Sequence, residues 1–385
     1  MKRKILAVTG IRSDYDLMTP VFREIQNHSK LELQLIVTGA HLSHAYGYTV
    51  EQIEKDGYLI AEKIESLLNS DLTSGRVKGL AIQLQGMVQA VERVKPDVLL
   101  VLGDREESMT TALVGAYMNI PVVHVAGGDR VIGNVDDQVR HAVSKLAHIH
   151  FTTNHESAER LIKLGEEPFR VFNTGNPGLD RLKEVPFLTR EELSQRLGFK
   201  IENGEPLILL IQHVISTEVQ YAYEQMKATM EAVKKLGIKT IISYPNSDAG
   251  GQQIIAAINE YADLPFIYVQ KNIPRLEFVN SMRHANCLLG NSSAGILEAP
   301  FLKLPVINVG NRQKGRLHAN NVQFIDHDVD EIINAVKKSI HDKEYLLKIK
   351  NGTNPYGNGD SASKIANILA DLQIDQKLLI KEITY

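Results

Sequence analysis

Carboxylates and histidines gather in one stretch of the first half of the chain, around a pair of glycines. The stretch begins His124-Val125-Ala126-Gly127-Gly128-Asp129 and continues as Gly133-Asn134-Val135-Asp136-Asp137-Gln138-Val139-Arg140-His141. Glycines let a backbone approach a ligand closely, and carboxylates and imidazoles can take up and return protons. The stretch therefore predicts acid–base chemistry, with Asp129 and Asp136 as candidates. Of the adjacent Asp136 and Asp137, one is expected only to cap the following helix.

A second charged group follows the apolar run 98–102, which leads into Gly103-Asp104-Arg105-Glu106-Glu107. The carboxyl end of a buried parallel strand faces the ligand crevice, so Asp104 and Arg105 are expected to be site residues. The alternative is that Asp104 caps the next helix.

The loop after the first predicted strand, Thr9-Gly10-Ile11-Arg12-Ser13-Asp14-Tyr15-Asp16, has the composition of a diphosphate site. A glycine turn before a helix exposes backbone donors, and the Arg12 guanidinium can bind phosphate in a bidentate way. The alternative is that Asp14 caps the helix and Arg12 is solvated. The spacing lacks the three glycines of the dinucleotide-binding fingerprint.

In the second half, Gly290-Asn291-Ser292-Ser293-Ala294-Gly295-Ile296-Leu297-Glu298 resembles a strand, a small-residue loop and a helix start. Ser292 and Ser293 could hold a phosphate, and Glu298, about one turn inside the helix, could accept both hydroxyls of a ribose. The alternative is a serine-capped helix with an incidental glutamate. His213 ends another apolar run and is either a core residue or a phosphate contact.

The elements that must position these residues alternate between short apolar runs and longer segments of helical period. This alternation is typical of an α/β fold with parallel sheets covered by helices. A helix is expected at 80–94, where it stops before Pro96, and another at 361–379. The expected strands lie at 4–8, 32–37, 98–102, 122–125, 150–153, 207–211, 239–243, 266–269, 287–289 and 306–309.

Two domains are expected from 385 residues. We place the boundary at Asn173-Thr174-Gly175-Asn176-Pro177-Gly178, which breaks both helix and strand. The first domain is then 1–174, joined by the C-terminal helix 361–385, and the second is 175–360. Loops at the carboxyl ends of the two sheets would place a ligand in the cleft between the domains.

Composition excludes several classes of protein. A net charge of −3 gives no sign of nucleic-acid binding, and no apolar stretch is long enough to cross a membrane. Cys287 is the single cysteine, so a disulfide framework and a thiolate zinc site are excluded, and a cytoplasmic location is expected. His148 and His150 alternate at strand spacing without a matching third ligand, so we interpret them as structural. No metal site is predicted.

Taken together, these segments resemble the UDP-N-acetylglucosamine 2-epimerases, and among them the hydrolysing branch that makes N-acetylmannosamine for sialic acid synthesis. The resemblance spans nearly the whole chain. It also includes His-Leu-Ser-His-Ala-Tyr-Gly-Tyr at 41–48 and Tyr-Pro-Asn-Ser-Asp-Ala-Gly at 244–250. The segment from Arg140 to His148 and the loop Asn311-Arg312-Gln313 are similar to the hydrolysing rather than the reversible branch.

The resemblance implies two Rossmann-like domains in the glycosyltransferase-B arrangement, a nucleotide sugar between them, and neither metal nor redox cofactor. The expected partners are that substrate and further copies of the chain, as a homodimer or homotetramer. The residues implied to hold UDP and the sugar are Arg12, Arg105, Asn246, Ser292, Ser293, Glu298 and Arg312, and those implied for catalysis are Asp104, Asp129, Asp136 and His213. Many relatives carry glutamate where Ala126 stands, so its function could fall to Asp129.

The implied reaction is conversion of UDP-N-acetylglucosamine and water to N-acetylmannosamine and UDP. UDP leaves by elimination to a 2-acetamidoglucal, and water then adds across the double bond. The alternatives are the same reaction on a modified sugar such as UDP-N,N'-diacetylbacillosamine, the reversible epimerase, and a glycosyltransferase of the same fold. A nucleotide-sugar-binding sensor is a further alternative, which the carboxylate cluster argues against.

Overall fold

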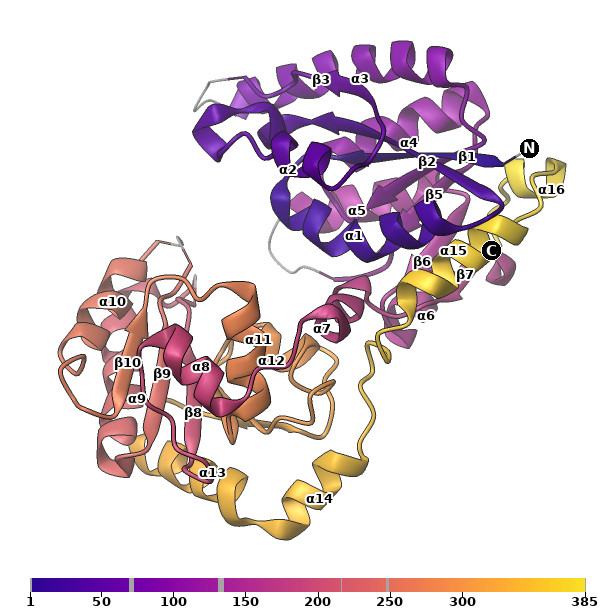
Figure 1. Cartoon of the computed structure of the whole chain (residues 1–385). Coiled ribbons are helices and arrows are strands. Elements are labelled where there is room, and N and C mark those ends of the chain that lie inside the picture. Colours follow the sequence, from indigo (N-terminus) through magenta and orange to yellow (C-terminus); the bar gives the residue numbers. More distant parts are fainter. Residues whose placement is uncertain (1, 69–72, 131–134, 216, 247–248, 385) are drawn as a thin grey trace. The chain divides into compact units, whose positions relative to one another are not determined.

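The computed structural model describes residues 2–68, 73–130, 135–215, 217–246 and 249–384. The chain forms two compact units, Met1–Arg181 with Tyr356–Tyr385, and Leu182–Pro355. Each contains one parallel sheet with helices on both faces (Figure 1). Four residues of predicted motifs, Gly133, Asn134, Ser247 and Asp248, lie outside the described residues.

The first unit contains a seven-stranded sheet in the order β3-β2-β1-β4-β5-β6-β7. Its strands are β1 (Arg3–Thr9), β2 (Leu31–Thr38), β3 (Ile60–Ile64), β4 (Val98–Leu102), β5 (Val122–Val125), β6 (Ile149–Thr152) and β7 (Val171–Asn173). Its helices are α1 (Arg12–Asn27), α2 (Val50–Lys55), α3 (Thr73–Val94), α4 (Glu106–Met118), α5 (Val135–Leu146), α6 (His155–Lys163), α15 (Ser361–Asp371) and α16 (Gln376–Leu379), and α7 (Asp180–Glu184) crosses into the second unit.

Alternation along the central strand β1 builds a core on each face of this sheet. Ile5 and Ala7 are buried on the face that also holds side chains of α1 and α15, whereas Leu6 and Val8 are buried on the other face, with side chains of α3, α4 and α5. Apolar side chains on both faces explain why the strand has an unbroken apolar run.

The second unit contains a six-stranded parallel sheet in the order β10-β9-β8-β11-β12-β13. Its strands are β8 (Leu207–Ile211), β9 (Lys239–Ser243), β10 (Ile267–Gln270), β11 (Cys287–Gly290), β12 (Val306–Val309) and β13 (Val322–Ile325). Its helices are α8 (Arg190–Leu197), α9 (Ala222–Leu236), α10 (Gly251–Asn259), α11 (Arg275–His284), α12 (Ala294–Leu297), α13 (Val329–His341) and α14 (Lys343–Asn351).

The prediction of a single C-terminal helix over 361–379 is wrong. The structure has α15 and α16 with a break at 372–375, and the Asp375 carboxylate accepts a hydrogen bond from the Leu378 backbone N–H (2.9 Å) as the cap of the second helix. A capping aspartate starts a new helix because its side chain replaces the missing backbone acceptor.

The first unit is larger than the predicted first domain, because it also includes 175–181 and 356–360. The Asp180 carboxylate accepts hydrogen bonds from the backbone N–H groups of Ser361 and Ala362 (3.2 and 3.0 Å) at the start of α15. Asn176 donates its backbone N–H to the Tyr356 carbonyl (2.8 Å). These bonds hold the turn after β7 within the first unit.

Candidate active site

The strongest cluster of predicted residues lies at the carboxyl edge of the first sheet. Gly103 has a φ of +74° directly after β4, and this turn presents Asp104 to Arg140 of α5. Arg140 binds the Asp104 carboxylate and donates a second hydrogen bond to the Ala126 carbonyl (2.8 Å). Burial raises the pKa of Asp104, and the nearby Asp136 raises it further against the lowering effect of Arg140. Asp104 thus pairs with Arg140 and has the charge of Asp136 nearby.

Arg105 begins a second group of charges beside the first. Its Nε lies 3.2 Å from the Glu107 carboxylate and 3.8 Å from the Asp14 carboxylate. The expected alternative that Asp14 caps α1 is wrong, because the N-cap is Ile11 and no side chain caps the helix. Arg12 is 79% exposed, with Asp16 3.9 Å from its Nε.

Asp129 is held at another part of the same edge. Its Oδ1 accepts hydrogen bonds from the Thr153 hydroxyl (2.6 Å) and the Ser157 hydroxyl (2.7 Å), and Arg160 of α6 binds the Gly128 carbonyl. These two hydrogen bonds to Oδ1 hold the carboxylate in place.

The histidines of this unit have structural partners. His124 is fully buried between the Gly103 carbonyl (2.7 Å) and the Ser144 hydroxyl (3.1 Å), and burial lowers its pKa to about 3. His150 lies 3.0 Å from the buried Glu166 carboxylate, and His148 accepts a hydrogen bond from the Val122 backbone N–H (3.1 Å). Both His148 and His150 thus have hydrogen-bonding partners within the first unit.

In the second unit, Asn291 connects three of the predicted loops. Its side chain accepts from the His213 backbone N–H (2.7 Å) and donates to the His213 carbonyl (2.9 Å), while its own carbonyl accepts from Arg312 (3.2 Å). The His213 ring accepts a hydrogen bond from the Asn246 backbone N–H (3.1 Å). His213, Asn246 and Arg312 are thus brought together at the carboxyl ends of β8, β9, β11 and β12.

The small-residue loop differs in part from its prediction. Helix α12 is a single turn, and Glu298 follows it as the C-cap rather than lying inside it. Ser292 accepts a hydrogen bond from the Ala294 backbone N–H (3.3 Å), and Ser293 is the N-cap without using its side chain. Arg275 of α11 donates to both oxygens of Glu298 (3.3 and 3.1 Å), which fixes the carboxylate.

Sequence reasoning missed the residues that hold the predicted ones in place. Asp14, Glu107 and Arg275 were not selected as site residues, and Asn291 appeared only within a motif. Two of these had a signal, since Asp14 and Asn291 lie in the loops that follow predicted strands. The pairing of Arg275 with Glu298 had no signal in the sequence, because the two residues are 23 positions apart.

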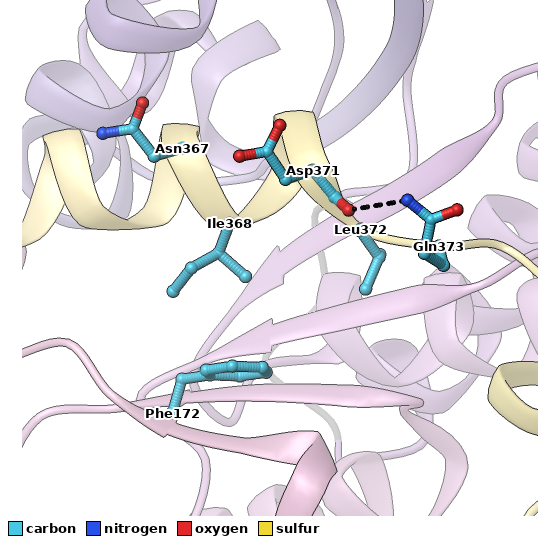
Figure 2. Close-up of a pocket in the computed structure, with 6 residues that line it drawn as sticks. All are labelled: Phe172, Asn367, Ile368, Asp371, Leu372 and Gln373. Carbon is cyan, nitrogen blue, oxygen red and sulfur yellow. Dashed lines mark hydrogen bonds between the residues drawn. The ribbon is translucent and has the colours of Figure 1, made fainter.

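Other features of the described residues do not mark a second site. An open hollow lined by Phe172 of β7 and by residues of and after α15 contains none of the predicted site residues (Figure 2). Within the described ranges, no three histidine, cysteine or acidic side chains are grouped to hold a metal ion. No described helix is both long and apolar enough to span a membrane.

Comparison with known proteins gives consistent matches over the whole chain. A family model described as UDP-N-acetylglucosamine 2-epimerase matches residues 23–370. A UDP-N,N'-diacetylbacillosamine 2-epimerase (hydrolyzing) of Legionella pneumophila is 37% identical over 381 residues, 99% of both chains. A GDP/UDP-N,N'-diacetylbacillosamine 2-epimerase (hydrolyzing) of Campylobacter jejuni is 35% identical over 89% of both chains.

Solved structures share the fold at lower identity. The UDP-GlcNAc 2-epimerase of Neisseria meningitidis, bound to UDP-GlcNAc, has a TM-score of 0.77 and 22% identity, with 95% of this chain and 99% of that chain covered. A structure from Listeria monocytogenes, titled as a UDP-N-acetylglucosamine 2-epimerase, has a TM-score of 0.79 and 19% identity, with 96% of both chains covered.

Proposed function

This chain belongs to the UDP-N-acetylglucosamine 2-epimerase family, and we propose that it is a hydrolysing member that converts a UDP-linked 2-acetamido sugar and water to UDP and the free 2-epimer. The observation that carries this proposal is Asp104, paired with Arg140 and close to the charge of Asp136. Two neighbouring carboxylates of different environment suit a reaction that removes one proton and adds another.

We propose UDP-N,N'-diacetylbacillosamine as the substrate. Two hydrolysing relatives named for that sugar are 37% and 35% identical to this chain, whereas a Neisseria meningitidis relative named UDP-N-acetylglucosamine 2-epimerase is 32% identical. From the sequence alone, UDP-N-acetylglucosamine is the first candidate substrate and the diacetylated sugar an alternative, so this proposal reverses that order. UDP-N-acetylglucosamine is the second candidate, supported by that relative. Formation of a homodimer or homotetramer stays a prediction.

In the proposed elimination, a carboxylate removes the proton from carbon 2 while the bond from carbon 1 to the diphosphate oxygen breaks. The proton is weakly acidic, so the developing charge on UDP must be stabilised as it leaves. We assign the proton removal of the elimination to the group Asp104, Asp136 and Asp129. Arg140 orients Asp104, and the Thr153 and Ser157 hydroxyls orient Asp129.

We assign the nucleotide contacts to the second unit. Glu298, held by Arg275, would accept hydrogen bonds from both ribose hydroxyls. The diphosphate would be bound by the residues linked through Asn291 and the His213 ring, which are His213, Asn246 and Arg312. Ser292 and Ser293 would contribute to the same diphosphate site. The exposed guanidinium of Arg12 is a further candidate for the diphosphate, and Arg105 is one for the sugar.

Labelled water tests the reaction. With either UDP-sugar in oxygen-18 water, elimination places the heavy oxygen on the free sugar and none on UDP, and in deuterated water one deuterium appears at carbon 2. Heavy oxygen on the phosphate would indicate a phosphohydrolase, and deuterium without free UDP would indicate the reversible epimerase. Faster release from the diacetylated sugar supports the proposed substrate, and faster release from UDP-N-acetylglucosamine contradicts it.

A further inference from the structure

We propose that Asp14 is a further catalytic residue of this enzyme, the acid that donates a proton to carbon 2 of the sugar while water adds at carbon 1. The inference rests on the proposed function and assigns one step of it to a residue outside the predicted site. Its evidence is the position of Asp14 and the charges that face it.

Asp14 lies where a ligand of the first unit is expected. It is in the first turn of α1, the helix that follows β1, and β1 pairs in parallel with β4, whose end carries Asp104 and Arg105. The carboxyl ends of adjacent parallel strands share one edge, so the two loops are neighbours. The Asp14 side chain is 22% exposed and does not serve as a helix cap.

The carboxyl groups around Asp14 outnumber the guanidinium groups. Asp104 pairs with Arg140, Glu106 pairs with Arg76, and Glu107 takes the nearest position on Arg105. Together with Asp136, whose charge acts on both Asp104 and Arg76, Asp14 brings the carboxyl groups to five against these three guanidinium groups. Asp14 lies 3.8 Å from the shared Arg105. Burial, together with the competition of two carboxylates for one guanidinium, raises the pKa values of both Asp14 and Glu107.

Asp14 is better placed than Glu107 to pass a proton to a ligand. Glu107 is covered by the loops after β1 and β2, since a Cβ at Gly10 would lie 1.9 Å, and one at Gly39 2.9 Å, from its Oε1. Asp14 remains partly exposed. Burial raises the pKa of Asp14 to about 7, with Glu107 and Asp104 adding to the rise and Arg105 and Ser13 opposing it.

In the proposed step, the protonated Asp14 carboxyl transfers its hydrogen to carbon 2 of the 2-acetamidoglucal. The π electrons of the carbon 1–carbon 2 double bond form the new C–H bond, and the oxygen of water bonds to carbon 1. The proton lost by that water passes to an ionised carboxylate of the site. Asp14 ends as a carboxylate and recovers its proton from solvent.

The test measures UDP, glycal and free sugar separately in the full-length Asp14→Asn variant. Elimination uses a different carboxylate, so UDP release is expected to continue, while free sugar falls by roughly 10²-fold or more relative to UDP and the glycal accumulates. Glu24→Gln, an exposed change on the same helix, is the matched control and should release UDP and sugar in equal amounts. Equal amounts of UDP and sugar from Asp14→Asn would overturn the proposal.

The wild-type protein supplies a second readout that does not depend on the variant folding. Supplied with the glycal and UDP, it should hydrate the glycal more slowly as the pH rises above about 7, because the acid form of Asp14 is needed. A flat rate to pH 9 would contradict the role of Asp14. If the wild type releases no UDP from either sugar nucleotide, the proposed function fails, and this inference fails with it.

Discussion

At the scale of single residues, arginines hold one carboxylate proposed for catalysis and one proposed for nucleotide binding. Arg140 fixes Asp104 in the first unit, and Arg275 fixes Glu298 in the second. A guanidinium that donates to a carboxylate favours its ionised form and sets its direction. The proposed roles of the two carboxylates differ. Asp104 lies near a second acid, Asp136, and is proposed to transfer a proton, whereas Glu298 is oriented by Arg275 and is proposed to accept hydrogen bonds from the ribose.

Asp136→Asn is expected to bind UDP normally and to lose turnover by roughly 10²- to 10⁴-fold, because an amide cannot carry the proton. Its neighbour Asp137 lies 3.7 Å from His141 on the same helix and serves as the matched control. Asp137→Asn should retain turnover within a few-fold. Steady-state kinetics and UDP calorimetry on both variants decide the assignment, and near-normal turnover of Asp136→Asn would transfer the role to another carboxylate.

Glu298→Ala is expected to weaken UDP binding by roughly 1 to 3 kcal/mol, since the ribose would lose a charged acceptor. The matched control is Glu277→Ala, which breaks another glutamate–arginine pair of the second unit, with Arg196 at 3.1 Å. Calorimetry should show unchanged affinity for the control. Equal affinities of the two variants would mean that Glu298 does not contact the nucleotide.

At the scale of elements, the strand ends of the second sheet approach so closely that only glycine fits. Gly290 ends β11 with a φ of +114°, and a Cβ there would lie 2.1 Å from the Ile211 carbonyl oxygen at the end of β8. This close approach allows Asn291 to bind both backbone groups of His213. The spacing of two strands therefore determines the geometry of the predicted nucleotide contacts.

Gly290→Ala is expected to lower the free energy of unfolding by roughly 2 to 4 kcal/mol and to weaken UDP binding, because the strand ends must separate. Gly237 provides the control, since its φ is +63° and no atom lies within 4 Å of an added Cβ. Gly237→Ala should cost only about 1 kcal/mol, from backbone conformation. Urea unfolding measures the loss of unfolding free energy in both variants. Equal losses in Gly290→Ala and Gly237→Ala would show that the contact with the Ile211 carbonyl oxygen does not destabilise the protein.

At the scale of the whole molecule, the end of the chain completes the first unit. Arg170 is fully buried and donates to the carbonyls of Leu378 (2.7 Å) and Ile380 (2.6 Å). Lys381 binds the Glu166 carboxylate (2.7 Å) and the Ala147 carbonyl (2.6 Å), at the end of α5. Residues more than 200 positions apart thus support the helix that carries Asp136.

The buried Glu166 carboxylate predicts a pH-dependent stability. Burial alone would raise its pKa, but the hydrogen bond from His150 and the charges of Lys381 and Lys145 lower it to about 2 from an ordinary 4.5. A lowered folded-state pKa adds stability that is present above pH 4.5 and is lost as the pH falls toward 2. Wild type should therefore exceed Glu166→Gln in unfolding free energy at pH 7, and this difference should shrink below pH 4.5.

Urea unfolding at several pH values checks this expectation. The exposed Glu156 on α6 provides the control, and Glu156→Gln should match the wild type throughout. A difference between wild type and Glu166→Gln that stays constant down to pH 3 would contradict the role of ionised Glu166.

The sequence alone determined the α/β class, because burial on both faces of a central strand is visible as a local apolar run. The strands at 98–102, 122–125, 207–211, 239–243 and 306–309 have the bounds expected from it. It did not predict β3, β7 and β13, which are short strands at sheet edges. An edge strand has fewer neighbours to cover it, so its residues need not be apolar, and its pattern is weak.

Only the tertiary structure decided which side chains meet. The sequence identified Asp104, Asp136, His213 and Glu298 because strand ends and helix starts are local features. Their partners come from distant segments: Arg140 lies 36 residues from Asp104, Asn291 78 residues from His213, and Arg275 23 residues from Glu298. Such pairs depend on the order of the strands in each sheet and on helix packing, and no local pattern records either.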